Sequence, residues 1–121
     1  MILLNGKNYT CPVDVTLDLI GGKWKILILF HLHYFTRKGY SEFRKNLPGI
    51  SEKMLSQQLK ELERDQLISK EQISVKPNRV EYFLTERGKS LVPLYEFVSE
   101  WGISYLKEYN IDYVQDQHLY K

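Results

Sequence analysis

The stretch that most constrains the fold of this chain is SEKMLSQQLKELERD, residues 51–65. Ser51 stands where a helix begins, and its hydroxyl can accept a hydrogen bond from an unpaired backbone N–H of the first turn. Leu55, Leu59 and Leu62 follow at the spacing i, i+4, i+7, which forms one apolar stripe. We therefore predict a single amphipathic helix that packs this stripe against a core.

The opposite side of this predicted helix carries basic, amide and hydroxyl side chains, which can bind base edges and phosphates. The candidate DNA-contacting residues are Ser51, Lys53, Ser56, Gln57 and Lys60. Gln57 is the candidate for reading a base, because an amide can pair with adenine through two hydrogen bonds. Lys53 and Lys60 are candidates for phosphate contacts. The alternative is an ordinary solvated face.

The sequence before residue 51 predicts a helix-turn-helix unit over residues 40–65. Ser41 is expected to cap a short helix over 42–46, and Leu47-Pro48-Gly49-Ile50 then forms a tight connection. Two short helices joined in this way are typical of helix-turn-helix proteins. Residues 36–39 are expected to form a polar, basic turn.

The first third of the chain predicts an arm followed by two helices. Residues 1–10 show no periodic pattern and are expected to be an extended N-terminal arm. Residues 11–34 hold the first helices, which Gly21-Gly22 separates. The second of these helices is apolar on nearly all sides, so it is expected to be central.

After residue 65 the hydrophobic period changes to 2, which predicts a two-stranded wing over residues 67–84. The turn between the strands carries three candidate DNA contacts, Lys76, Asn78 and Arg79. They are expected to reach a minor groove or its phosphates. For Arg79 the alternative is an ion pair with a nearby carboxylate such as Glu81.

Residues 85–109 predict a C-terminal dimerisation helix that Thr85 caps and Pro93 kinks or restarts. Its aromatic stripe exceeds what one small core covers, so a homodimer contact is favoured over a purely intramolecular core. Residues 110–121 are expected to be a tail. The predicted dimer-interface residues are Val13, Leu17, Leu94, Tyr95, Val98, Trp101 and Tyr105.

Length and composition predict one globular domain of 121 residues, and the absence of catalytic and ligand motifs predicts no cofactor, metal site or enzymatic activity. His31 and His33 lie on an apolar helix without ligand partners at suitable spacing, and no nucleophile–base motif is present. Residues 37–90 hold twelve Lys and Arg against eight Asp and Glu, which suits a polyanionic partner. One cysteine and no apolar run of membrane-spanning length predict a cytoplasmic protein.

Cys11 is a candidate redox sensor, because a thiol at a helix N-terminus has a lowered pKa and the thiolate is the reactive form. Lys7 and Lys23 would add to this effect if they lay close to the thiol. The alternative is a small buried hydrophobe near the dimer contact.

Three segments of the chain resemble the HxlR-type regulators. These segments are Cys11-Pro12-Val13 with LDLIGGKWK over 17–25, the turn and helix LPGIS with KML and QLKELE over 47–63, and RVEY with LTE and Gly88 over 79–88. The resemblance extends from about residue 11 to 104. Tyr40 stands where Phe is usual, and Lys76 precedes a single Pro where a Pro-Pro pair is frequent.

The resemblance implies a mainly α protein with a small β-hairpin wing, namely a winged helix-turn-helix whose N- and C-terminal helices form a dimer interface. It implies a bacterial, MarR-related transcription factor that binds pseudo-palindromic double-stranded DNA as a homodimer. In some members the Cys of the Cys-Pro motif senses oxidants or electrophiles. Two alternatives remain: a protein-interaction module that uses the same face on an acidic partner, and an added small-molecule effector pocket lined by Trp101, Tyr95 or Tyr105.

Overall fold

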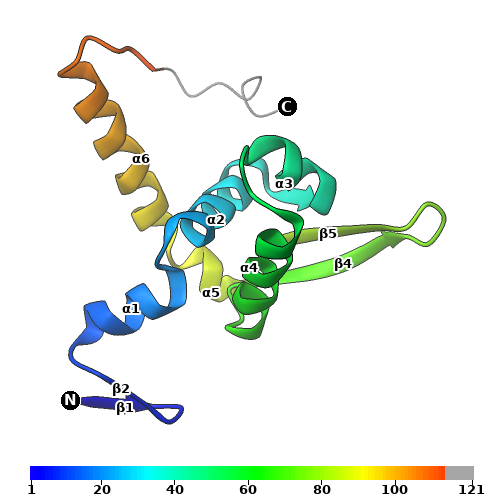
Figure 1. Ribbon diagram of the computed structural model, residues 1–121, viewed down its shortest axis with the longest axis horizontal. Helices are drawn as coiled ribbons and strands as arrows, with labels where there is room; N and C mark the ends of the chain where they lie inside the picture. The colour runs from blue at the N-terminus through cyan, green and yellow to red at the C-terminus, as the bar shows by residue number, and fades with distance from the viewer. Residues whose placement is uncertain (114–121) are drawn as a thin grey trace.

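A computed structural model of the chain describes residues 1–113 and shows a mixed α+β fold (Figure 1). The elements in chain order are β1 (Ile2–Leu4), β2 (Lys7–Tyr9), α1 (Pro12–Ile20), α2 (Lys23–Phe35), β3 (Arg37–Gly39), α3 (Tyr40–Asn46), α4 (Glu52–Arg64), β4 (Ile68–Ser74), β5 (Arg79–Leu84), α5 (Glu86–Lys89) and α6 (Val92–Lys107). None of the described helices is long and apolar enough to cross a membrane.

Helix α2 is central, as the sequence predicts, and α4 and α6 pack against it (Figure 1). Its residues Ile28 and Leu29 are fully buried. They belong to one hydrophobic core together with Leu55 and Leu62 of α4. Because α4 packs on α2 through its leucines, its polar side faces away from the core.

The wing is a three-stranded antiparallel sheet in the order β3-β5-β4. Strand β4 pairs with β5 from Ile68 opposite Leu84 to Ser74 opposite Arg79, and β3 adds to the other edge of β5. The sequence predicted only a turn over 36–39, so β3 is a correction. The pattern predicted a solvated turn because it contains charged residues. Lys38 is nevertheless only 3% exposed, and its Nζ lies 4.4 Å from the centre of the Phe35 ring.

The N-terminal residues form a β-hairpin, where the sequence predicted only an extended arm. Asn5 and Gly6 both have positive φ, as a tight two-residue hairpin turn requires. The hairpin is attached to α1, because the Tyr9 hydroxyl donates to Asp18 at 2.6 Å. Tyr9 is the buried residue of this hairpin.

The C-terminal segment consists of two helices, α5 and α6, and not one helix over 85–109. The Thr85 side chain caps α5 by accepting from the Gly88 N–H, and Pro93 lies in the first turn of α6. Proline therefore starts the second helix, which is one of the two outcomes that the sequence left open. The predicted tail over 110–121 is described only as far as residue 113, and residues 114–121, with His118, lie outside the described part.

Candidate nucleic-acid interface

Helix α4 has the predicted start and the predicted buried stripe. The Ser51 hydroxyl accepts a hydrogen bond from the Met54 N–H at 3.0 Å. Leu55, Leu59 and Leu62 are at most 2% exposed. The stripe fixes the rotation of the helix about its axis, so the residues at the other positions have a defined outward direction.

Three of the predicted contacts share the outer face of α4. Lys53, Gln57 and Lys60 are exposed and follow the spacing i, i+4, i+7. Ser51 is also exposed, but its hydroxyl already caps the helix. Ser56 is half-buried and its hydroxyl lies 3.3 Å from that of Tyr40, so it faces α3 more than the outer face.

The turn between α3 and α4 holds the two helices in a fixed relation. Gly49 has φ +91, which a residue with a side chain rarely adopts, and the Ile50 N–H donates to the Leu47 carbonyl. Helix α3 begins at Tyr40, one residue before the predicted cap at Ser41. The Tyr40 hydroxyl donates to the Glu52 carbonyl at 3.0 Å, which links the two helices directly.

A buried ion pair supports α4 from behind, and sequence reasoning missed it. Lys25 Nζ on α2 donates to Glu61 Oε1 at 2.9 Å, and the two side chains are only 9% and 25% exposed. Hydrogen bonding from Lys25 is the main reason that the pKa of Glu61 lies below its usual value. Gln57 contributes a smaller effect in the same direction. Glu61 therefore connects the buried Lys25 to the exposed Gln57. The sequence does contain a sign of this ion pair: Lys25 lies on a helix that is apolar on nearly all sides, and a buried charge needs a partner of opposite sign.

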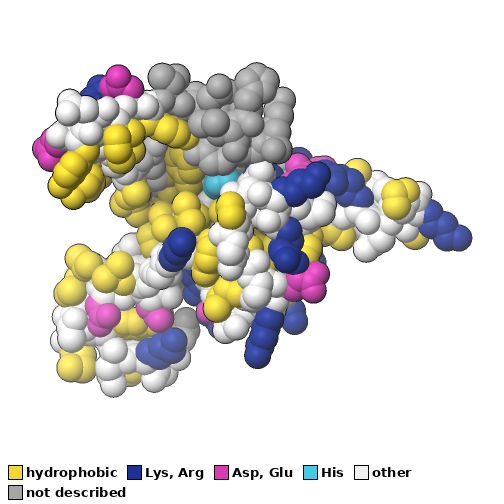
Figure 2. All heavy atoms as spheres, turned by 45° about the horizontal axis from the view of Figure 1, so that its top comes forward, with side chains coloured by type: hydrophobic (Ala, Val, Ile, Leu, Met, Phe, Trp, Pro, Cys, Tyr) yellow, Lys and Arg dark blue, Asp and Glu magenta, His cyan; other side chains and the backbone are white. Residues whose placement is uncertain are grey.

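The wing carries its predicted basic tip. Lys76 and Asn78 are exposed, and Asn78 Oδ1 accepts a hydrogen bond from Gln72 at 2.9 Å. Figure 2 shows Lys and Arg side chains at the outer end of this hairpin. Figure 1 shows the hairpin on the other side of the molecule from α1 and α6.

Arg79 adopts the arrangement that the sequence left open as the alternative. Its Nη2 lies 2.6 Å from Glu42 Oε1 and 2.7 Å from Glu81 Oε2. Hydrogen bonds to Glu42 first and Glu81 second raise the pKa of Arg79. Glu42 also accepts from the Gly39 N–H, so Arg79 joins the base of the wing to the first turn of α3. In this state the guanidinium is paired with protein carboxylates.

Most of the predicted dimer residues lie on exposed apolar surface of α1 and α6. The exposed fractions are 64% for Val13, 60% for Leu17, 49% for Val98, 60% for Trp101 and 46% for Tyr105, and Leu94 is half-buried. Trp101 and Tyr105 stack on each other with ring centres 5.5 Å apart. Figure 2 shows hydrophobic side chains along both of these projecting parts.

Tyr95 is a correction to the predicted interface. It is 1% exposed, and its hydroxyl donates to the Gly88 carbonyl at 2.8 Å. Burial raises its pKa far above the usual value. The helical period places Tyr95 beside the aromatic stripe, but in the fold it packs against α2 and the end of α5, where a partner cannot reach it.

Cys11 is exposed and lies directly before α1. The backbone N–H of Asp14 and then the Thr10 hydroxyl lower the pKa of its thiol by hydrogen bonding. The two lysines that could assist are engaged elsewhere: Lys7 pairs with Asp18 at 3.3 Å, and Lys23 lies over the Trp24 ring. The lowered pKa therefore comes from the start of the helix.

No group of three or more His, Cys, Asp or Glu side chains within residues 1–113 is arranged to hold a metal ion. The outer face of α4 and the tip of the wing offer exposed basic and amide side chains, namely Lys53, Gln57, Lys60, Lys76 and Asn78. The model of the HxlR-like helix-turn-helix family matches residues 19–110. The chain belongs to the HxlR-like helix-turn-helix family.

Proteins similar to this chain are named as transcriptional or redox regulators. The uncharacterized HTH-type transcriptional regulator YdeP of Bacillus subtilis is 48% identical over 95 residues, which cover 78% of this chain and 73% of YdeP. The structure of the redox regulator HypR in its oxidized form matches with a TM-score of 0.74 and 45% identity, covering 78% of this chain and 96% of HypR. The structure of a MarR-family transcriptional regulator from Porphyromonas gingivalis W83 matches with a TM-score of 0.67 and 35% identity. The match covers 79% of this chain and 93% of that regulator. This HxlR-like chain is a winged-helix transcriptional regulator, and its relatives are regulators and not enzymes.

Proposed function

We propose that this HxlR-like protein binds a pseudo-palindromic DNA operator as a homodimer, with α4 in the major groove and the wing at the minor groove. The observation that carries the proposal is the exposed row of Lys53, Gln57 and Lys60 on a helix that its leucines hold in one orientation. An α-helix fits the major groove, and these side chain types match base edges and phosphates.

The residues of α4 have different roles in this proposal. Gln57 reads a base, because its amide is exposed on the outer face of α4 and can pair with adenine through two hydrogen bonds. Lys53 and Lys60 bind phosphates, which set the register of the helix without reading sequence. Ser51 and Ser56 lie at the edge of the contact, since both hydroxyls already have partners within the protein.

Lys76 and Asn78 make the wing contacts in this proposal, because both are exposed at the hairpin tip. Arg79 positions the wing through Glu42 and contacts DNA only if these ion pairs open. Lys76 contributes charge, so its effect depends on salt concentration.

A second copy of the chain covers the apolar surface of α1 and α6 in this proposal. Water contact with Leu17 and Trp101 costs free energy of about 25 cal/mol for each Å² of apolar area. An isologous dimer removes this cost twice and presents two α4 helices to two half-sites. Operator binding also implies that the protein acts in the cytoplasm, where a bacterial chromosome lies.

We also propose that Cys11 makes the regulator responsive to oxidants or electrophiles. The exposed thiol with a lowered pKa supports this, as does the likeness of this chain to the redox regulator HypR. Thiolate reacts with such compounds and thiol does not.

Selection of binding sites from random duplexes tests the operator proposal. We expect a selected site with two-fold symmetry and half-sites about one helical turn apart, and a mass of two chains by sedimentation. Affinity should fall log-linearly with salt concentration. Failure to enrich any sequence, together with salt-sensitive binding to an acidic protein, would favour the interaction module.

A further inference from the structure

The outer end of the wing carries exposed apolar side chains. Ile73 is 48% exposed and Val75 is 73% exposed, and Pro77 in the turn is exposed as well. Figure 2 shows hydrophobic side chains beside the Lys and Arg side chains at this end of the molecule. Single exposed apolar residues are ordinary on a protein surface, but three within five positions at a projecting end form a patch. We call Ile73, Val75 and Pro77 the apolar tip.

The apolar tip is held in a defined shape by the strands that carry it. The register of β4 on β5 shifts between Gln72 and Ser74, so Ile73 is an extra residue in β4. Such a bulge interrupts the alternation of side chains along a strand and gives one of them a new direction. The Gln72 amide donates to Asn78 Oδ1 at 2.9 Å, which links the two sides of the turn.

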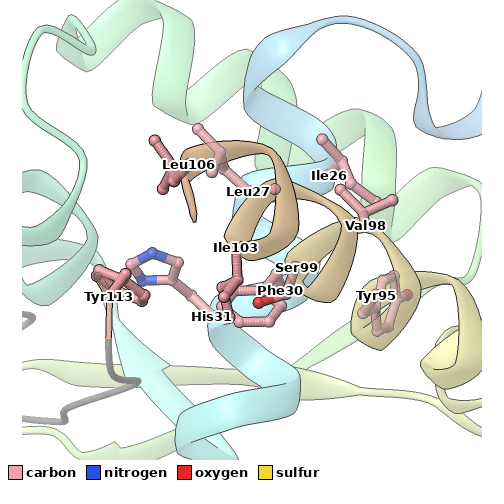
Figure 3. Close-up of a pocket in the computed structure, with 11 residues that line it drawn as sticks. Ile26, Leu27, Phe30, His31, Tyr95, Val98, Ser99, Ile103, Leu106 and Tyr113 are labelled. Carbon is pink, nitrogen blue, oxygen red and sulfur yellow. The ribbon is translucent and has the colours of Figure 1, made fainter. Parts of the chain in front are cut away.

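The exposed apolar surface of α1 and α6 already has an occupant in the proposed dimer. A pocket of about 290 Å³ between α2 and α6 is lined by Val98, which is one of the predicted interface residues (Figure 3). Gly102 also lines it, and a Cβ added there would meet no atom within 4 Å. The wing lies on the other side of the molecule from α1 and α6 (Figure 1). The apolar tip therefore needs a different partner.

The charges near the apolar tip favour a polyanion as this partner. Residues 72–80 contain Lys76 and Arg79 and no Asp or Glu. The wing carboxylates Glu71 and Glu81 lie nearer its base, where they pair with Arg37. Proteins that bind the DNA minor groove combine Lys or Asn side chains with apolar wedges such as Ile and Pro. The end of the wing has both kinds of side chain within six positions, 73–78.

We propose that the apolar tip enters the minor groove beside each half-site as a wedge and partly unstacks one base step. This inference rests on the proposed operator binding and adds a way to select sequence where the protein reads no base edge. Lys76 holds the adjacent phosphates, while Ile73 and Val75 contact the sugars and the opened base step. Pyrimidine–purine steps such as TA kink most easily, so the wedge selects such a step in the operator flank.

Binding of the full chain to duplexes that differ only in the flanking step tests the wedge. The half-sites are those obtained by site selection, and hydroxyl-radical protection locates the step under the wing. That step is then TA or AT. The two steps show the same hydrogen-bonding groups in the minor groove, so only their shape and deformability differ. We expect about fivefold tighter binding to the TA duplex.

The outcomes of this comparison separate the wedge from operator binding itself. Equal affinity for TA and AT, with intact discrimination between operator and random duplex, would overturn the wedge and leave the proposed function standing. Failure to discriminate any sequence from random duplex would overturn both.

The double variant Ile73→Ser with Val75→Ser tests whether these residues form the wedge. We expect the preference for TA over AT to disappear, while the melting temperature and the slope of log affinity against log salt stay as in the wild type. Leu3→Ser is the matched control, because Leu3 is 72% exposed on β1, and it should leave the preference unchanged. A preserved preference in the double variant, or unchanged affinity for every duplex, would overturn the proposal.

Bending of the operator gives a readout that is independent of affinity. A wedge in the minor groove kinks the duplex toward the major groove. Energy transfer between dyes at the two ends of the operator duplex, at saturating protein, should show a shorter end-to-end distance with the wild type than with the double serine variant. The same distance with both proteins would mean that the apolar tip does not open a base step.

Discussion

Helices α4 and α6 have outer faces of opposite character. Each packs one side against the rest of the chain and leaves the other side exposed (Figure 1). The exposed side of α4 carries Lys53, Gln57 and Lys60, whereas that of α6 carries Trp101 and Tyr105.

The polar face of α4 and the apolar face of α6 therefore give different evidence for a binding partner. Charged and amide groups are well solvated, so their exposure on α4 does not by itself require a partner. The DNA proposal therefore needs the fold and the family as further support. Large apolar side chains lose free energy in water, so the surface of α6 calls for a cover on energetic grounds alone.

Trp101→Glu should have the largest effect, because it places a charge in the middle of the proposed dimer contact. We expect dimer association to weaken by about 3 kcal/mol, roughly 100-fold, and operator binding to fall with it. Analytical ultracentrifugation measures the first effect. Glu100→Gln on the polar side of the same helix serves as the control and should leave the mass unchanged. A Trp101→Glu protein that remains dimeric would move the interface away from α6.

Lys25→Met tests whether the outer face of α4 depends on its buried support. It leaves the quarter-exposed Glu61 without its partner, and we expect a loss of about 2 kcal/mol in the free energy of unfolding at pH 7. The folded pKa of Glu61 lies below 4.5, so the pair stabilises the fold above that pH and loses its effect as the pH falls through the lowered value. Denaturant titrations at pH 7 and pH 3.5 should therefore show a smaller difference between variant and wild type in acid.

The double variant Lys25→Met with Glu61→Gln is the matched control for this pair. It removes both charges and should recover part of the stability, since no buried charge is left unpaired. Equal destabilisation in both variants would show that Lys25 acts through packing of its carbon chain.

Gln57→Ala should reduce discrimination between operator and random duplex by about 1.5 kcal/mol, roughly tenfold. The neighbouring Gln58 is half-buried, and its Nε2 lies 3.5 Å from the Met54 sulfur. Gln58→Ala is therefore the control and should leave discrimination unchanged. Competition binding against bulk DNA measures both. Full discrimination by Gln57→Ala would remove this residue from base reading.

Lys76→Ala should weaken binding to all duplexes by a similar, few-fold factor and lower the slope of log affinity against log salt by about 1. Lys70→Ala is the control, because Lys70 lies on β4 near Glu63 and away from the hairpin tip. An unchanged slope in Lys76→Ala would exclude a phosphate contact by the wing tip.

Cys11→Ser should have the smallest effect, since it leaves operator affinity under reducing conditions unchanged. The thiol is exposed directly before α1, and α1 lies away from the wing (Figure 1). Diamide treatment should alter operator binding by the wild type and leave the variant unaffected. An equal response of both proteins would remove Cys11 as a sensor.

Sequence reasoning predicted the elements that local pattern determines. The leucine spacing and Ser51 gave α4, and the alternation after residue 65 gave β4 and β5 within two residues. It offered the Arg79–Glu81 ion pair as an alternative, but it did not identify contacts between residues farther apart in the chain. Arg79 meets Glu42 37 positions away, and Tyr95 reaches the Gly88 carbonyl only because the chain turns between α5 and α6.

Strand β3 and the β1–β2 hairpin were missed for a different reason. Both contain strands of three residues, too short to show an alternating pattern. Lys38 is a charged residue that the fold buries over aromatic rings, which contradicts the usual expectation for lysine. The Asn5-Gly6 pair is the sequence signal for the N-terminal hairpin, because both residues tolerate the positive φ of its tight turn.

Gly102 is a position of α6 at which a larger side chain fits the existing fold. Any glycine codon becomes an alanine codon by one nucleotide change, and at this position the added Cβ would meet no atom within 4 Å. A single mutational event at this position therefore changes the surface of α6 and leaves the residues of α4 and the wing as they are.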